Sequence, residues 1–249
     1  MALLEVTEVT VRFGGVTAVD GATFSAAAGR VTGLIGPNGA GKTTLFDVVS
    51  GLQPPQGGTV VYRDRNLRGM SPSSRSRGGI GRTFQRLEAF GSLTVRENVL
   101  VAIEIHDRAI RRGGAAERVR RADHLLRRVG ILDFADRRAD QVPTAVARLL
   151  EVARALATAP RLLLLDEPSS GLTPAETRRF GALLRDLAAQ RRAVVIVEHD
   201  MSLVMGCCDD IHVLDSGRII ASGTPDEIRA CRRVRRAYLG FERDGGTAS

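Results

Sequence analysis

A glycine-rich loop between a short apolar strand and a helix constrains the fold more than any other feature of this sequence. The segment Gly36-Pro-Asn-Gly-Ala-Gly-Lys-Thr-Thr44 matches the phosphate-loop pattern G-x-x-x-x-G-K-[ST]. An apolar run ending at Ile35 precedes it, and residues 43–51 read as a helix closed by Gly51. Glycines let backbone N–H groups surround a phosphate, and the helix N-terminus adds favourable partial charge. The pattern therefore predicts a phosphate-binding loop rather than a glycine-rich turn that only joins two core elements.

The chemistry of phosphate binding assigns roles within this loop. Lys42 is expected between the β- and γ-phosphates, and the Thr43 hydroxyl is expected to ligate Mg²⁺. The remaining loop positions expected to contact the nucleotide are Gly36, Asn38, Gly39, Gly41 and Thr44. Lys42 is the one lysine among 36 basic residues, and all the others are arginines. A lysine that persists in such a background indicates a position that needs a compact point charge.

The net charge of +8 does not by itself indicate a nucleic-acid partner. The arginines are spread along the chain, and many have Asp or Glu nearby in the sequence. Aromatic residues make up 4% of the chain and Trp is absent, which disfavours base-stacking surfaces. Three cysteines without C-x-x-C spacing disfavour a zinc site and fit a reducing compartment. We expect no signal peptide and no transmembrane segment, since the apolar runs are short.

A second strand ends in two acidic residues. The run Leu162-Leu-Leu-Leu-Asp-Glu167 is apolar up to its last two positions. Asp166, at the carboxyl end of a parallel strand, is expected to face the phosphate loop and hold the Mg²⁺ water shell. Glu167 is expected to orient or deprotonate the attacking water. The alternative is a buried strand whose two acidic residues only face solvent. The presence of a phosphate loop in the same chain disfavours this alternative.

Two further polar residues occupy junctions of the predicted fold. His199 follows the apolar strand of residues 193–197, where it could reach the γ-phosphate or be an ordinary turn residue. Gln85 follows Thr83-Phe84, where the first part of the core gives way to a helical insert. Neither residue carries a prediction alone.

Apolar strands that alternate with helices predict an α/β fold with a mainly parallel sheet covered on both faces. We expect strands from Leu4 to Phe13, from Ala18 to Phe24 and from Thr59 to Tyr62, and a loop over residues 63–82. The middle of the chain has helical periodicity, with a loop at 111–114 and a helix over 151–159. A helix over 177–190, a hairpin over 211–221 and a basic helix from Pro225 complete the prediction.

In their order along the chain, the phosphate loop, Gln85, the Asp166–Glu167 pair and His199 resemble the ATP-binding subunits of ATP-binding-cassette (ABC) transporters. The resemblance extends from Phe13, which would stack on adenine, to about Gly240. It implies a P-loop NTPase (RecA-like) core with a mainly parallel sheet, antiparallel strands at the N-terminus and an inserted helical subdomain. Residues 1–240 would form one nucleotide-binding domain with core segments 1–88 and 155–225 and a helical subdomain over 89–154. A basic helix and polar tail would occupy 226–249.

The segments 82–85, 93–99 and 220–228 are similar to those of the branched-chain amino-acid importer subgroup, although related systems for urea and amides share them. The resemblance implies ATP and Mg²⁺ as cofactors, with Thr43, Gln85 and Asp166 at the metal and Glu167, His199 and Gln85 in catalysis. It also implies transmembrane permease subunits as partners, indirectly a solute-binding protein, and a peripheral place on the cytoplasmic face of the membrane. No nucleic acid is expected as a partner.

One segment departs from the family pattern. The family carries a signature close to Leu-Ser-Gly-Gly-Gln that binds the γ-phosphate of ATP held by a partner subunit, and here it falls on residues 142–146. Pro143 offers neither hydroxyl nor N–H, Ala145 places a methyl where backbone must approach phosphate, and Val146 replaces the glutamine. Thr173 likewise stands where the family usually has Asp. This predicts a heterodimer with a paralogue that has an intact signature, and ATPase activity that depends on that partner.

Three alternatives remain at this point. The chain could be a regulatory or structural paralogue that binds ATP with little hydrolysis. A small-molecule kinase is disfavoured by the Asp166–Glu167 pair, by His199 and by the lack of a recognisable acceptor-binding lid. A DNA-repair or chromosome-type ATPase is disfavoured by the small size of the chain and the absence of a coiled coil.

Overall fold

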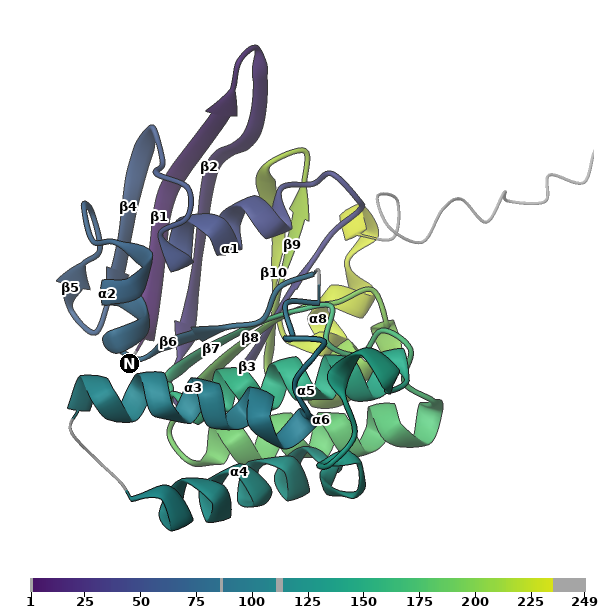
Figure 1. The fold of residues 1–249 in the computed structure, drawn as a ribbon. Coiled ribbons are helices and arrows are strands. Elements are labelled where there is room, and N and C mark those ends of the chain that lie inside the picture. The colour runs from purple at the N-terminus through teal and green to yellow at the C-terminus, as the bar shows by residue number, and fades with distance from the viewer. Residues whose placement is uncertain (1, 86, 111–113, 235–249) are drawn as a thin grey trace, which may run out of the picture.

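Two β-sheets and a group of helices make up the protein (Figure 1). The computed structural model describes residues 2–85, 87–110 and 114–234. An antiparallel sheet has the strand order β2-β1-β4-β5, and a six-stranded sheet has the order β10-β9-β3-β8-β7-β6. The first comprises β1 (Ala2–Phe13), β2 (Val16–Ala27), β4 (Gly57–Tyr62) and β5 (Arg65–Asn66). The second comprises β3 (Val31–Ile35), β6 (Ile80–Arg82), β7 (Leu162–Asp166), β8 (Ala193–Val197), β9 (Asp210–Asp215) and β10 (Arg218–Gly223).

The helices lie on both sides of the six-stranded sheet. They are α1 (Lys42–Ser50), α2 (Pro72–Arg77), α3 (Val95–Ile110), α4 (Ala115–Val129), α5 (Thr144–Ala157), α6 (Pro174–Ala189), α7 (Met201–Cys207) and α8 (Pro225–Ala230). Short 3₁₀ turns cover Leu132–Phe134 and Ala139–Gln141. Helices α3, α4 and α5 pack against one another below the sheet in Figure 1. They fall between β6 and β7 in the chain, where a helical insert was expected.

The central strands are buried on both faces, which explains their unbroken apolar sequence. In β7, Leu162 and Leu164 join a core with α1 and the antiparallel sheet. Leu163 and Leu165 point the other way, into a core with the helices below the sheet. Strands β6, β7, β8, β3 and β9 are parallel neighbours, and β10 pairs antiparallel with β9. The predicted α/β fold with a mainly parallel sheet is confirmed.

The prediction of a loop over residues 63–82 is wrong. This stretch contains β5, α2 and β6. Helix α2 begins after Ser71, whose side chain accepts a hydrogen bond from the Ser74 N–H, and Pro72 occupies its first turn. The helix is six residues long and made of Pro, Ser and Arg, so it has no apolar periodicity to reveal it. It forms because Arg75 is anchored by tertiary contacts.

Other boundaries also differ from the prediction. Helix α5 begins at Thr144 instead of Glu151, β2 is longer at both ends, and α8 ends at Ala230 with Cys231 as its C-cap. Residues 111–113 of the loop predicted at 111–114, and the tail from residue 235, lie outside the described residues. Among the helices that the structure describes, none is both long and apolar enough to cross a membrane.

Candidate functional site

The glycine-rich loop connects β3 to α1 and is held by close backbone packing. Gly41 is the N-cap of α1 and has a φ of 103°, in the left-handed region that favours glycine. A Cβ atom there would lie 2.3 Å from the carbonyl oxygen of Ala18, on β2. A Cβ atom at Gly36 would lie 2.0 Å from the carbonyl oxygen of Leu214, on β9. The two glycines therefore allow the loop to lie directly against both sheets.

A cavity of about 260 Å³ opens above this loop. Most of the predicted nucleotide-binding residues line it together with two residues predicted for catalysis. The lining residues are Ala18, Asn38, Gly39, Ala40, Gly41, Lys42, Thr43, Thr44, Gln85 and Glu167. Residues from β2, from the loop and α1, and from the segments after β6 and β7 thus surround one space.

Lys42 lies at the floor of this cavity with its side chain almost fully buried. Its Nζ atom donates hydrogen bonds to the carbonyl oxygens of Gly36, at 2.7 Å, and Pro37, at 2.9 Å. Burial lowers the pKa of Lys42, and the nearby carboxylates of Glu167 and Asp166 oppose that effect. The loop therefore holds an ammonium group in a fixed position beside two carboxylates.

Three predicted catalytic residues meet at one carboxylate. Glu167 Oε1 lies 3.0 Å from His199 Nε2 and accepts a 3.4 Å hydrogen bond from Gln85 Nε2. The backbone of Glu167 has a φ of 48°, which is unfavourable for a side chain with a Cβ. Its N–H donates to the carbonyl oxygen of Val197, at the end of β8. This contact fixes the turned backbone that presents the carboxylate to the cavity.

Asp166 ends β7 and has 1% of its surface exposed. Among the residues that the structure describes, neither carboxylate oxygen has a hydrogen-bond partner, although Arg82 Nη2 lies 3.9 Å from Oδ2. Burial raises the pKa of Asp166, and Arg82 partly offsets that rise. An orphaned buried carboxylate is costly unless a cation or a donor meets it. These oxygens, close to the hydroxyl of Thr43 on α1, fit a hard cation such as Mg²⁺.

Arg82 connects this region to α1, and the sequence reasoning assigned it no role. Its Nη1 atom donates to Asp47 Oδ1 at 2.7 Å and to Ser50 Oγ at 2.8 Å. The guanidinium also lies over the ring of Phe84, 5.0 Å from its centroid. The signal in the sequence that could have identified Arg82 was its position at the end of a strand, three residues before Gln85. The contacts themselves depend on α1 and could not be read from the sequence.

The Gln85 segment also contacts α5, the helix that begins in the segment that departs from the family signature. Arg148, on α5, donates through Nη1 to the carbonyl oxygens of Gln85, at 2.6 Å, and Phe84, at 3.3 Å. Pro143 is the N-cap of α5, with an extended ψ of 150° and no side-chain capping bond. Helix α5 therefore begins within the segment matched to the signature, and Pro143 has no hydroxyl that could bind phosphate.

Phe13 is a predicted nucleotide-binding residue that does not line the cavity. It ends β1 with half of its surface exposed. Its stacking on adenine therefore stays a prediction. Gly36 also does not line the cavity, but its carbonyl oxygen holds Lys42.

Comparisons with known proteins agree with this geometry. The family model described as ABC transporter matches residues 19–170, and one described as branched-chain amino acid ATP-binding cassette transporter matches residues 218–240. The chain is 40% identical to the high-affinity branched-chain amino acid transport ATP-binding protein LivG of Salmonella typhimurium, over 96% of this chain and 98% of that protein. It is 39% identical to BraF of Pseudomonas aeruginosa, a protein of the same description, with the same coverage.

A solved structure shows the same fold. The ADP conformation of MJ1267, an ATP-binding cassette of an ABC transporter, has a TM-score of 0.85 and 28% identity, and the match covers 97% of this chain and all of that one. A phosphate loop, a carboxylate pair at the end of β7 and nearly full-length relatives all indicate one family. The chain belongs to the ABC transporter family, as an ATP-binding subunit whose ATPase activity is coupled to transport.

Proposed function

We propose that this chain powers the uptake of branched-chain amino acids or related small solutes from the cytoplasmic face of a membrane, where transmembrane permease subunits hold it. The substrate class rests on the descriptions of LivG and BraF and on the match over residues 218–240. A separate solute-binding protein would select the solute. The observation that carries the proposal is the meeting of Glu167, His199 and Gln85 at the phosphate-loop cavity.

The residues around the cavity have different roles in ATP hydrolysis. Lys42 holds the β- and γ-phosphate oxygens, and the loop N–H groups surround them. Asp166 and Thr43, with Gln85 at the rim, would hold Mg²⁺, which when bound neutralises phosphate charge. Glu167 orients the attacking water and accepts its proton, and His199 fixes the Glu167 carboxylate.

This chain would contribute to two ATP sites in a dimer, and its contributions to the two sites differ. Its own loop has Lys42, Asp166 and Glu167 in place. The start of α5, which would complete the partner's site, has Pro143 as its N-cap and a methyl at Ala145. Each lost charged hydrogen bond to phosphate costs about 1.5–3 kcal/mol. We therefore propose a heterodimer in which hydrolysis occurs mainly at the loop of this chain.

The test is ATP hydrolysis by the purified chain alone and mixed with a paralogue that has an intact signature. Hydrolysis should be low for the chain alone and high for the mixture. Glu167→Gln in this chain should abolish it, and the matched substitution in the paralogue should have a much smaller effect. Replacing residues 142–146 by Leu-Ser-Gly-Gly-Gln should raise hydrolysis by the chain alone.

Two outcomes would reject the proposal. Equal and high hydrolysis at both sites of the unmixed chain would exclude the need for a heterodimer. Unchanged hydrolysis by the mixture after Glu167→Gln would instead support a regulatory or structural subunit that binds ATP. Binding of a fluorescent ATP analogue, measured in parallel, separates a loss of hydrolysis from a loss of folding.

A further inference from the structure

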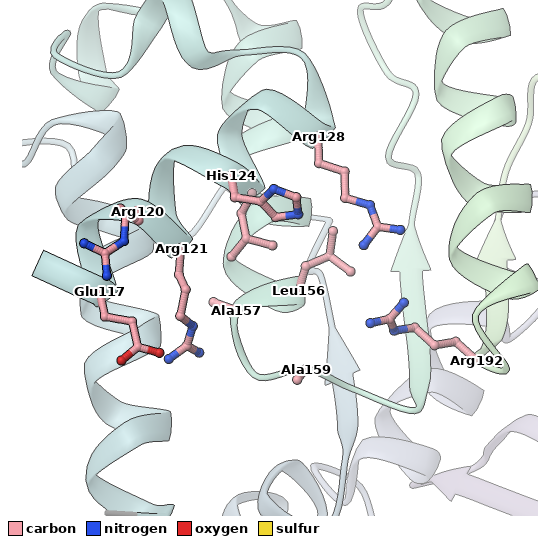
Figure 2. Close-up of a pocket in the computed structure, with 10 residues that line it drawn as sticks. Glu117, Arg120, Arg121, His124, Arg128, Leu156, Ala157, Ala159 and Arg192 are labelled. Carbon is pink, nitrogen blue, oxygen red and sulfur yellow. The ribbon is translucent and has the colours of Figure 1, made fainter. Parts of the chain in front are cut away.

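A second cavity, of about 360 Å³, lies between α4, the end of α5 and the start of β8 (Figure 2). It is far from the phosphate loop along the strands. Ala159 and Arg192 line it shortly before β7 and β8 begin, whereas Asp166 is the last residue of β7 and His199 lies just beyond the end of β8. The two cavities share no lining residue. The second cavity is therefore separate from the nucleotide site.

Arginine and histidine side chains make up five of the ten residues that line this cavity. Arg121, His124 and Arg128 recur at three- and four-residue spacing and so lie on one face of α4. Arg120 on α4 and Arg192 before β8 also line the cavity, against the single carboxylate of Glu117 in that lining. In Figure 2 the guanidinium groups of Arg128 and Arg192 project toward each other, away from Glu117.

The arginines are anchored from outside the cavity. Arg121 bonds both carboxylate oxygens of Asp107, at 2.7 and 2.9 Å, and Arg128 Nη2 bonds Asp186 at 2.5 Å. Neither carboxylate lines the cavity. A guanidinium has five N–H donors, so these contacts orient the group and leave other donors for a ligand. Asp186 is 59% exposed, and an exposed ion pair contributes little stability that a ligand would have to overcome.

Arg192 is held close to another cation. Its Nε and Nη1 atoms donate to Pro160 O and to Gln190 Oε1. Burial and the charge of Arg128 both lower the pKa of Arg192, with Asp186 opposing them. An anion between the two arginines would relieve this repulsion. The partly buried Leu125 and the exposed Ala159 supply apolar surface beside the basic groups, over the buried Leu156 and Ala157.

We propose that this cavity binds a small organic anion, with a phosphate or carboxylate held by Arg128, Arg192 and His124 and an apolar body resting on Leu125 and Ala159. Arginine forks match both headgroups in two-point contacts. The bound ligand would contact both α4 and the segments that precede β7 and β8. Asp166 and His199 lie at the opposite ends of these two strands. The site is thus suited to a regulatory ligand distinct from ATP.

The chain has four histidines, which makes NMR of the imidazole groups a site-resolved test. His124 reports on this cavity and His199 on the nucleotide site, and substitution of each to Gln assigns its signal. Phenyl phosphate supplies the anion and the apolar body, and inorganic phosphate supplies the anion alone. Titration with phenyl phosphate should shift His124 in a saturable way, and inorganic phosphate should bind more weakly.

Arg128→Gln and Arg192→Gln should each weaken this binding by about tenfold or more, since a charged hydrogen bond is lost. Arg65→Gln, at an exposed position of β5, should leave it unchanged. Unshifted signals of His106 and His212 show that each variant is folded. The proposal fails if sodium chloride at equal ionic strength gives the same His124 shift, if only His199 responds, or if the two arginine variants bind as tightly as the parent.

Discussion

The Oε1 atom of Glu167 lies 3.0 Å from the Nε2 atom of His199, across 32 residues of chain. The contact follows from the pairing of two parallel strands. Asp166 at the end of β7 is in register with Val197 at the end of β8. The residues that follow these strands therefore meet at one edge of the sheet, beside the phosphate loop.

Substitution of His199 should affect the chemical step more than binding. His199→Ala removes the group that fixes the Glu167 carboxylate, so we expect kcat to fall by about 100-fold. The affinity for ATP should change by less than about threefold, because the Lys42 contacts remain. Hydrolysis by the mixture of subunits and binding of a fluorescent ATP analogue measure the two effects. His106→Ala, on α3, is the control, and an equal loss of affinity and rate for His199→Ala would contradict the prediction.

Lys42 should not be replaceable by arginine. Its ammonium fits between the carbonyl oxygens of Gly36 and Pro37, and a planar guanidinium is too large for that position. Lys42→Arg and Lys42→Ala should each weaken ATP binding by about tenfold or more. Calorimetric titration with ATP measures this loss, and Lys42→Arg binding as well as the parent would show that the site only needs a positive charge. Arg65→Lys is the matched reverse substitution at an exposed position.

Arg75 should be a major determinant of stability. Its buried guanidinium donates to the carbonyl oxygens of Met70, Val48, Val49 and Leu67, at 2.7 to 3.1 Å. Arg75→Leu removes all four of these buried hydrogen bonds, so the free energy of unfolding should fall by about 3 kcal/mol or more. Urea unfolding followed by circular dichroism gives this value.

Arg77 is the control for Arg75 on the same helix. It is exposed, and its guanidinium donates a 3.3 Å hydrogen bond to Ser74 Oγ. Arg77→Leu should therefore change the free energy of unfolding by less than about 0.5 kcal/mol. Equal losses for the two variants would mean that the carbonyl contacts of Arg75 do not stabilise α1 and α2.

Glu151 should make stability depend on pH. Burial raises the pKa of Glu151, and Arg154, whose Nη1 donates to it at 2.7 Å, partly offsets the rise. A carboxyl group with a raised folded-state pKa stabilises the fold at acid pH, and this contribution is lost as pH rises through that value. Glu151→Gln keeps an acceptor for Arg154 but does not titrate.

The thermal midpoint of Glu151→Gln relative to the parent should therefore increase above about pH 4.3, the usual value for Glu in an unfolded chain. It should become constant once the pH exceeds the folded-state pKa. Glu5→Gln, on an exposed position of β1, should show no such trend. A constant difference for Glu151→Gln across this range would contradict the prediction.

The sequence predicted the parts of the fold that local pattern determines. The phosphate loop follows a motif, and β7 and β8 are continuous apolar runs, so β8 was predicted with its observed bounds and β7 was predicted to begin one residue too early, at Arg161. Helix α2 was missed because Arg75 holds it from outside by contacts with α1. The start of α5 was placed too late because Pro143 and Thr144 carry no apolar periodicity.

In the candidate site, as in the fold, the sequence identified residues that belong to motifs but not the contacts between distant segments. Lys42 was predicted from the phosphate-loop motif, Glu167 from its place after an apolar strand, and Gln85 and His199 from the family resemblance. The structure brings them together. The contacts of Arg82 with Asp47 and of Arg148 with the Gln85 carbonyl join segments far apart in sequence. No motif encodes these distances, so only the folded chain reveals them.

The glycines of the phosphate loop link nucleotide binding to the arrangement of the two sheets. Gly36 rests against the backbone of β9 in one sheet, and Gly41 rests against the backbone of β2 in the other. A tilt of one sheet relative to the other would therefore displace the N–H groups that surround phosphate. Affinity for ATP thus becomes a measure of the angle between the sheets, and substitutions far from the loop that alter this angle would tune nucleotide affinity without touching the nucleotide.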